Sequence, residues 1–239
     1  METDVIVVAD DTDILVLLQH HFNPATHKKI YLQTSTKLLD ISVLQNTLQR
    51  ELSRSLLFIH ALSGCDTTSR PYGVGKLSAI AKYEELEGCA WLFLSEQQSH
   101  ADIEQAGHQA LATLYGCSDL NSGRVLKFTQ KVISSSSYLP PERLPPTADA
   151  ARFHSRPVCL QVQAWLGNNM EPAEWGWMLH KTAKGDILKP QKMEQTAAPA
   201  SLLNIIRCGC SGRKYLLLQK KWTALYTGMW SMQRDILHQ

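Results

Sequence analysis

The hydrophobic pattern of the first forty residues predicts two strands with a helix between them. Val5 to Ala9 is a continuous apolar run, mostly β-branched, which is typical of a strand buried on both faces of a parallel sheet. An acidic turn follows, and the apolar spacing from Ile14 to Phe22 predicts a helix that ends at Asn23-Pro24. The segment KKIYLQ, residues 28–33, predicts the second strand.

The chain that follows has mainly helical periodicity. Apolar residues recur at helical spacing from Leu38 to Leu62, and we expect a helix there with a break near Ser53–Ser55. Further helices are predicted for Lys76–Leu86 and Asp102–Tyr115. Two strands joined by an acidic turn and a helix, then mainly helices, indicate an α/β fold with a parallel sheet.

A Ser- and Pro-rich segment, SSSSYLPPERLPP, begins at Ser134 and has the composition of a linker. It predicts a first domain over residues 1–133, a linker over 134–147 and a C-terminal region over 148–239. We expect the C-terminal region to be mainly helical and partly irregular. Ala148–Leu166 reads as helical in parts, and a Pro-bounded loop is expected after EPAEWGWML, residues 171–179.

Charge and cysteine usage exclude several classes of protein. With 24 basic and 22 acidic residues the net charge is +2, too balanced to indicate a nucleic-acid or membrane partner by itself. The start lacks the features of a signal peptide, and no apolar run reaches the length of a membrane span. Six scattered cysteines do not resemble a disulfide framework. We therefore expect a protein of the nucleus or cytoplasm, neither secreted nor membrane-bound.

The acidic turn is the first candidate for chemistry. Asp11 and Asp13 follow a strand predicted to be parallel, and open α/β sheets bind their ligands at the carboxyl ends of such strands. Carboxylates two positions apart can reach one cation, and Mg²⁺ or Mn²⁺ prefers oxygen ligands. An Asp before a helix is also a common N-cap. Three Asp residues in four positions favour the metal site.

A second candidate is the segment Gly73-Val74-Gly75-Lys76 at the start of a predicted helix. Glycines allow a tight turn, and the free N–H groups at a helix start can face a phosphate. Lys76 adds positive charge for a DNA backbone. Such a turn is commonly no more than a turn, but here Gly64-Cys65-Asp66 and the acidic strand end precede it.

In this order the motifs resemble the second half of the flap-endonuclease (XPG-like) nuclease fold of the PIN-like superfamily, over roughly residues 4–90. The resemblance implies that Asp11, Asp13 and Asp66 are ligands of Mg²⁺ or Mn²⁺. It also implies that Gly73, Gly75 and Lys76 form a helix-hairpin-helix-like element that contacts DNA. Such enzymes hydrolyse phosphodiesters with two metal ions.

The chain is also similar to a group of transposon-associated animal proteins with a Cys-rich tail. The phrases HALSGCDTTS, LQVQAWLGN, PAEWGWML and SLLNIIRCGC carry this likeness. In that group Cys208 and Cys210 would begin a tesmin-type CXC module, but Tyr226 and Trp230 stand where further cysteines are expected. Because a structural zinc site needs four ligands, we expect these two to be degenerate zinc-type cysteines, without zinc.

The chain departs from the nuclease pattern at its start, since it begins within the strand that carries the D-x-D motif. The earlier acidic residues of that fold are missing, and we expect a domain truncated at its N-terminus, with an exposed sheet edge.

Three functions remain open at this point. The first is a divergent metal-dependent nuclease-like protein, with phosphodiester hydrolysis on DNA or RNA as its ancestral reaction and DNA as the more expected partner. The second is a non-catalytic nucleic-acid-binding or interaction remnant of a mobile element. The third is a phosphatase similar to haloacid dehalogenases, with Asp11 as nucleophile, although Leu15 stands where that motif has Thr or Val.

Overall fold

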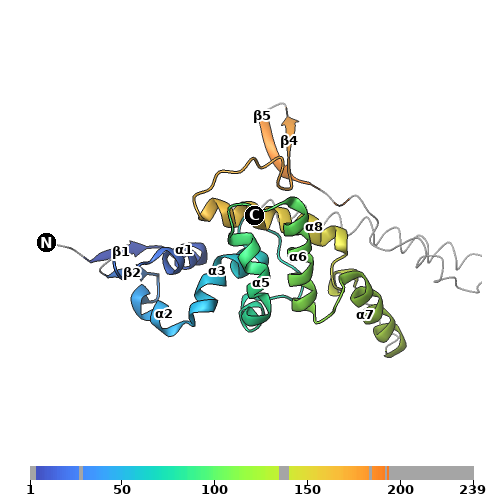
Figure 1. Ribbon diagram of the computed structural model, residues 1–239, viewed down its shortest axis with the longest axis horizontal. Coiled ribbons are helices and arrows are strands. Elements are labelled where there is room, and N and C mark those ends of the chain that lie inside the picture. Colours follow the sequence, from blue (N-terminus) through green and yellow to red (C-terminus); the bar gives the residue numbers. More distant parts are fainter. Residues whose placement is uncertain (1–3, 27–28, 135–139, 183–184, 192, 194–239) are drawn as a thin grey trace, which may run out of the picture. The chain divides into compact units, whose positions relative to one another are not determined.

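The computed structural model describes residues 4–26, 29–134, 140–182, 185–191 and 193. The chain divides into two units, Met1–Glu194 and Gln195–Gln239. The second unit, with Cys208 and Cys210, lies outside the described residues, so the degenerate zinc module stays a prediction. The first unit is a mixed α/β structure made mostly of helices (Figure 1).

A three-stranded sheet lies near the N-terminal end. Its strands are β1 (Val5–Val8), β2 (Ile30–Gln33) and β3 (Leu38–Asp40), in the order β1-β2-β3. The parallel pairing of the two predicted strands is confirmed, with Val5 opposite Ile30 and Val8 opposite Gln33.

The third strand corrects the expectation of a helix from Leu38 and of a purely parallel sheet. β3 runs antiparallel to β2. The turn between them is closed by the backbone N–H of Thr34, which donates to Lys37 O at 2.8 Å, and by the Thr34 hydroxyl, which donates to the same oxygen at 3.0 Å. Because this hydroxyl-bonded turn reverses the chain, residues 38–40 extend the sheet before the next helix begins.

The sheet is covered on one side by a small core. Helices α1 (Thr12–His21) and α2 (Ile41–Thr47) flank it, and Phe22, Leu32 and Ile41 are its buried centre. Val7 packs against this core, whereas Ile6 and Val8, on the other face of the sheet, are 60% and 78% exposed. The prediction that the first strand is buried on both faces is therefore wrong for the described part of the chain.

A larger helical body follows the sheet (Figure 1). Its elements are α3 (Arg50–Leu62), α4 (Lys76–Ile80), α5 (Tyr83–Leu94), α6 (His100–Tyr115), α7 (Leu120–Ser134), a 3₁₀ turn (Pro141–Arg143) and α8 (Ala148–Trp165). The last five residues of α3, Phe58–Leu62, are all buried, so this end of the helix is enclosed on every side.

Two predicted helix boundaries are wrong. The break between α2 and α3 falls at Leu48–Gln49, where the backbone is extended, and not at Ser53–Ser55. Ser55 instead lies buried within α3. The helix expected over Lys76–Leu86 is two helices, with the chain turning at Ala81-Lys82.

Helix α8 is continuous and completes the main core. Ala151, Val158 and Val162 of α8 are fully buried in the same cluster as Phe58 of α3 and Phe93 of α5. The core is therefore built from residues on both sides of the segment 134–147. Within that segment, Pro145 O accepts a hydrogen bond from Arg124 Nη1 of α7 at 2.7 Å.

A β-hairpin occupies the region in which a Pro-bounded loop was expected. Strands β4 (Trp177–Thr182) and β5 (Gly185–Pro190) pair antiparallel, and nearly all of their residues are exposed. Among the described residues, no helix has the length and apolar character needed to cross a membrane.

Candidate metal centre

Asp11 and Asp13 lie where the chain leaves the sheet and enters α1. The pairing with β2 ends at Ala9, whose N–H donates to Gln33 O at 3.0 Å. Asp11 has an extended backbone and is the N-cap of α1, with its Oδ1 accepting the N–H of Asp13 at 2.8 Å. The N-cap interpretation of Asp11 is thus confirmed, and it uses one carboxylate oxygen, leaving Oδ2 for another ligand.

Asp66 lies in a tight loop after α3. Gly64 has a φ of +105°, and a Cβ there would lie 2.8 Å from Arg70 Cβ, so the two ends of the loop come close only because this residue is glycine. The Thr68 hydroxyl accepts the Cys65 N–H at 3.0 Å and donates to Ala61 O at 2.7 Å. These bonds tie the loop to the end of α3 and leave Asp66 exposed.

Side chains of helix α8 also form hydrogen bonds with this loop and with the end of α3. His154 Nε2 lies 2.9 Å from Leu62 O, and the Ser69 hydroxyl lies 2.9 Å from His154 Nδ1. Because a carbonyl only accepts, Nε2 carries the proton and Nδ1 accepts from Ser69. Gln161 Oε1 of α8 also accepts a hydrogen bond from the Thr67 hydroxyl.

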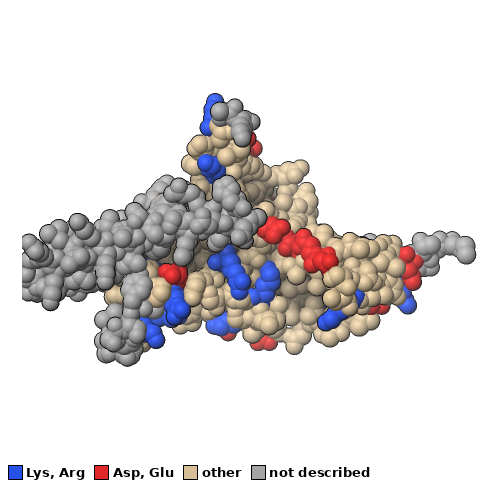
Figure 2. All heavy atoms as spheres, turned by 180° about the vertical axis from the view of Figure 1, so that it is seen from behind, with Lys and Arg blue, Asp and Glu red and all other residues tan. Residues whose placement is uncertain are grey.

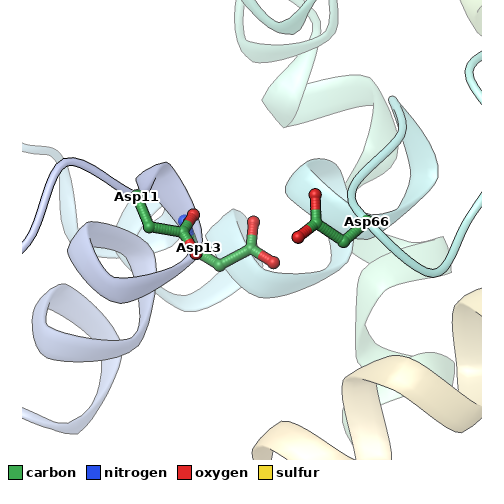
Figure 3. A group of neighbouring side chains, drawn as sticks. All are labelled: Asp11, Asp13 and Asp66. Atoms are coloured by element: carbon green, nitrogen blue, oxygen red, sulfur yellow. The ribbon is translucent and has the colours of Figure 1, made fainter. Parts of the chain in front are cut away.

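The three predicted metal ligands come together. Asp11, Asp13 and Asp66 each offer a carboxylate oxygen, and these oxygens lie within 4.8 Å of one another. Figure 3 shows the three carboxyl groups pointing toward one another, two from the start of α1 and one from the loop after α3. Asp13 is half-buried and the other two are exposed. An all-oxygen donor set of this kind suits Mg²⁺ or Mn²⁺.

Two further residues extend the cluster inward: His60, which the sequence did not place in this site, and Lys76, which it assigned to a nucleic-acid contact. His60 Nε2 of α3 lies 2.6 Å from Asp13 Oδ1, and Lys76 Nζ lies 3.0 Å from His60 Nδ1. Lys76 Nζ also donates to Gly64 O at 2.7 Å. The sequence held one signal for His60, which is the single ionisable residue of the apolar run LLFIHAL, residues 56–62. A buried ionisable side chain needs a polar partner, so this position predicts a contact with another polar group.

Burial changes the titration of both groups. It lowers the pKa of His60; the positive charge of Lys76 lowers it further, and the hydrogen bond to Asp13 acts in the opposite direction. Burial also lowers the pKa of Lys76, and the charge of Arg70 adds to this, while Cys65 and Asp13 oppose it. His60 is therefore favoured as a neutral imidazole between a carboxylate and an ammonium group.

The predicted hairpin lies next to this network. Gly73 has a φ of +74°, and Gly75 is the N-cap of α4, with its N–H donating to the Ser78 hydroxyl at 3.0 Å. Lys76, expected to face a phosphate, instead directs its ammonium group toward His60 and Gly64. Contact of Gly73 and Gly75 with nucleic acid stays a prediction.

Cys65, which precedes Asp66, lies next to two threonine hydroxyl groups. Its Sγ lies 3.1 Å from the Thr68 hydroxyl and 3.5 Å from the Thr67 hydroxyl. His60 uses both ring nitrogens on Asp13 and Lys76. The geometry gives no support to a Cys–His pair.

Charge on the wider surface is mixed. On the face shown in Figure 2, acidic side chains form one band and basic side chains gather beside it, so neither sign of charge covers that face.

No protein-family model, no curated protein and no solved structure matches this chain. The function is therefore inferred from the residues of the site alone.

Proposed function

We propose that this protein is a divergent, Mg²⁺- or Mn²⁺-dependent nuclease of the PIN-like type that acts on DNA rather than RNA. The observation that carries the proposal is the convergence of Asp11, Asp13 and Asp66, from two segments more than fifty positions apart, to within 4.8 Å. Carboxylates repel one another at this distance, and a divalent cation offsets that repulsion.

The cation, the three carboxylates and the Gly73–Gly75 turn have separate roles in the proposed reaction. A cation bound there supplies Lewis-acid polarisation of a phosphodiester oxygen and a more acidic bound water. Asp11, Asp13 and Asp66 would hold the cation. The turn at Gly73–Gly75 is joined to the same site through Lys76 and His60, and it would be the part that contacts a nucleic-acid backbone.

A second candidate function is a nucleic-acid-binding module that does not cleave. Two-metal nucleases bind two ions about 4 Å apart with several shared carboxylates. In the described residues only three carboxylates come together at this site. One ion held by three carboxylates can bridge protein and phosphate without hydrolysing the bond. The phosphatase alternative has less support, because Leu15 stands where its motif has Thr or Val.

The described cysteines also suit a reducing compartment, and we propose that the protein works in the nucleus or cytoplasm. Cys65, Cys89, Cys117 and Cys159, the cysteines of the described residues, are free thiols. Free thiols of this number persist where glutathione and thioredoxin keep them reduced.

Cleavage of labelled single-stranded, duplex and flap DNA and of RNA, with and without Mn²⁺, tests the proposal. We expect Mn²⁺-dependent cleavage of DNA that Asp13→Asn and Asp66→Asn abolish, while Asp186→Asn, an exposed acid of the β4–β5 hairpin, leaves it unchanged. Metal-dependent binding without cleavage would favour the non-catalytic module. Hydrolysis of small phosphate esters, lost in Asp11→Asn and kept in Asp66→Asn, would favour the phosphatase.

A further inference from the structure

The described structure contains a chain of hydrogen bonds that the proposed chemistry does not by itself require. It runs from Gly64 O through Lys76 Nζ and the imidazole of His60 to Asp13 Oδ1, with lengths of 2.7, 3.0 and 2.6 Å. We infer that His60, with its tautomer fixed by Lys76, is a positioning residue that holds the Asp13 carboxylate for the divalent cation. This inference rests on the proposed function.

The direction of each hydrogen bond follows from the donors available. An ammonium group only donates, so His60 Nδ1, which faces Lys76 Nζ, must carry a lone pair. In a neutral imidazole the proton is then on Nε2, and Nε2–H donates to Asp13 Oδ1. Lys76 thereby selects the one neutral tautomer that can donate to the carboxylate.

The surroundings keep His60 in place. Its side chain is 4% exposed, and that of Asp13 is 19% exposed. The residues on either side of it in α3, Ile59 and Ala61, are buried in the main core. The ring of Trp165 lies beside it, with centroids 5.8 Å apart. An imidazole enclosed in this way can change its rotamer only if the core around α3 opens.

This arrangement has a consequence for the metal ligands. With Oδ1 held by His60, the Asp13 carboxylate is fixed in orientation and its Oδ2 remains for a cation. Groups that hydrogen-bond a metal ligand from behind commonly contribute a factor of about 10 to 100 in metal affinity. The same hydrogen bonds hold the ammonium group of Lys76 near the three acidic side chains. Attraction between the opposite charges favours this inward orientation of Lys76.

The first measurement reads the tautomer without metal. Long-range ¹⁵N–¹H NMR of the chain labelled at its histidines, at pH 7.5, distinguishes a protonated Nε2 from a protonated Nδ1. We expect His60 to be neutral with the proton on Nε2, and we expect Lys76→Met to give a mixture of tautomers. Lys181→Met, at an exposed position of β4, is the control and leaves the His60 signals unchanged. A proton on Nδ1 in the unmodified chain would overturn the inference.

The second measurement reads the effect on the cation. Mn²⁺ titrations of His60→Leu, His60→Gln and the exposed control His180→Leu are compared with the unmodified chain. We expect His60→Leu to weaken Mn²⁺ binding by about 10- to 100-fold. Glutamine can still donate to Asp13 and accept from Lys76, so His60→Gln should recover most of the affinity. Circular dichroism establishes that each variant is folded, and if His60→Leu is not, the comparison is made with His60→Asn, whose shorter amide cannot span both partners.

The outcomes separate this inference from the proposed function. Two results would overturn the positioning role and leave the proposed function standing. In the first, His60→Leu binds Mn²⁺ as tightly as the unmodified chain. In the second, His60→Gln loses as much Mn²⁺ affinity as His60→Leu. No Mn²⁺ binding by the folded unmodified chain would overturn both.

Discussion

Two buried histidines lie beside the loop that carries Asp66, and each ring has two hydrogen-bond partners. His154 is enclosed between Leu62 O and the Ser69 hydroxyl, and burial lowers its pKa. His60 lies between Asp13 and Lys76, and burial lowers its pKa too. Both rings connect elements that are distant in sequence, so the position of the loop that carries Asp66 depends on the hydrogen bonds of these rings.

The lowered pKa of His154 makes stability depend on pH. Above about pH 6.5, the ordinary histidine pKa, both folded and unfolded chains carry a neutral ring. Below it the unfolded ring gains a proton that the folded ring resists, so the free energy of unfolding falls as the pH is lowered. At pH 5.5 the loss reaches at most about 1.4 kcal/mol for one histidine.

Urea unfolding at pH 7.5 and pH 5.5 measures this loss. We expect His154→Gln to have a smaller difference between the two pH values than the unmodified chain, and the exposed-site control His180→Gln to have the same difference as the unmodified chain. An unchanged pH dependence in His154→Gln would mean that this ring is protonated in the folded protein.

Close packing of α6 on α8 depends on Gly107. A Cβ at this position would lie 1.8 Å from Ser155 Oγ and 2.6 Å from Ser155 Cβ. We expect Gly107→Ala to lower the free energy of unfolding by about 2 to 3 kcal/mol, since the helices would have to separate. Gly88 of α5 has open space around it, and Gly88→Ala should raise stability by about 0.5 to 1 kcal/mol. Urea unfolding of both variants checks the pair, and similar effects of the two substitutions would contradict this packing.

At the scale of elements, local sequence predicts some parts of the fold and not others. The apolar run at Val5 and the acidic turn after it predict β1 and α1, because the strand preference of β-branched residues and helix capping are local properties, whereas the exposure of Ile6 and Val8 is not. Leu38–Asp40 is too short to distinguish a strand from a first helical turn, and the turn at Thr34–Lys37 decides in favour of β3. Ser53–Ser55 looked like a break because serine is a weak helix former, but tertiary packing buries Ser55 within α3.

The β4–β5 hairpin should be the least stable element among those described. Its residues are nearly all exposed, and an isolated two-stranded hairpin is marginal in water. We expect its backbone amides to exchange with deuterium by local opening, far faster than those of α3, whose buried residues are Leu52, Ser55 and 57–62. Hydrogen exchange followed by mass spectrometry checks this, and equal protection of the two elements would show that a partner or another segment covers the hairpin.

At the scale of the whole described unit, the candidate site combines residues that the sequence predicts with residues that only long-range contacts bring into it. Asp11 and Asp13 were predicted from the local pattern of a strand that ends in an acidic turn, and Asp66 from the resemblance to the nuclease family. His60, His154 and Gln161 were not, because they act through contacts 47, 85 and 94 positions away in the sequence. Such contacts exist only once α1 and α8 have packed on α3, and no local pattern encodes that packing.

The free edge of the sheet predicts self-association. Within the described residues β1 pairs only with β2, and Val5, Ile6 and Val8 are 50%, 60% and 78% exposed. An apolar edge strand with unpaired backbone groups is a template for another strand. We expect sedimentation velocity to detect concentration-dependent association that Ile6→Lys reduces. Leu126→Lys, at an exposed position of α7, should not reduce it, and equal effects of the two substitutions would point to nonspecific hydrophobic contact.

The central claim is that Asp11, Asp13 and Asp66 form one cation site, and calorimetric titration with Mn²⁺ tests it most directly. The unmodified chain, Asp66→Ala and the exposed control Asp186→Ala are titrated after circular dichroism has shown that all three are folded. We predict saturable binding in the unmodified chain and the control, and its loss in Asp66→Ala. Absence of saturable binding in the unmodified chain, or binding that Asp66→Ala retains in full, would contradict the claim that these three carboxylates hold a metal ion together.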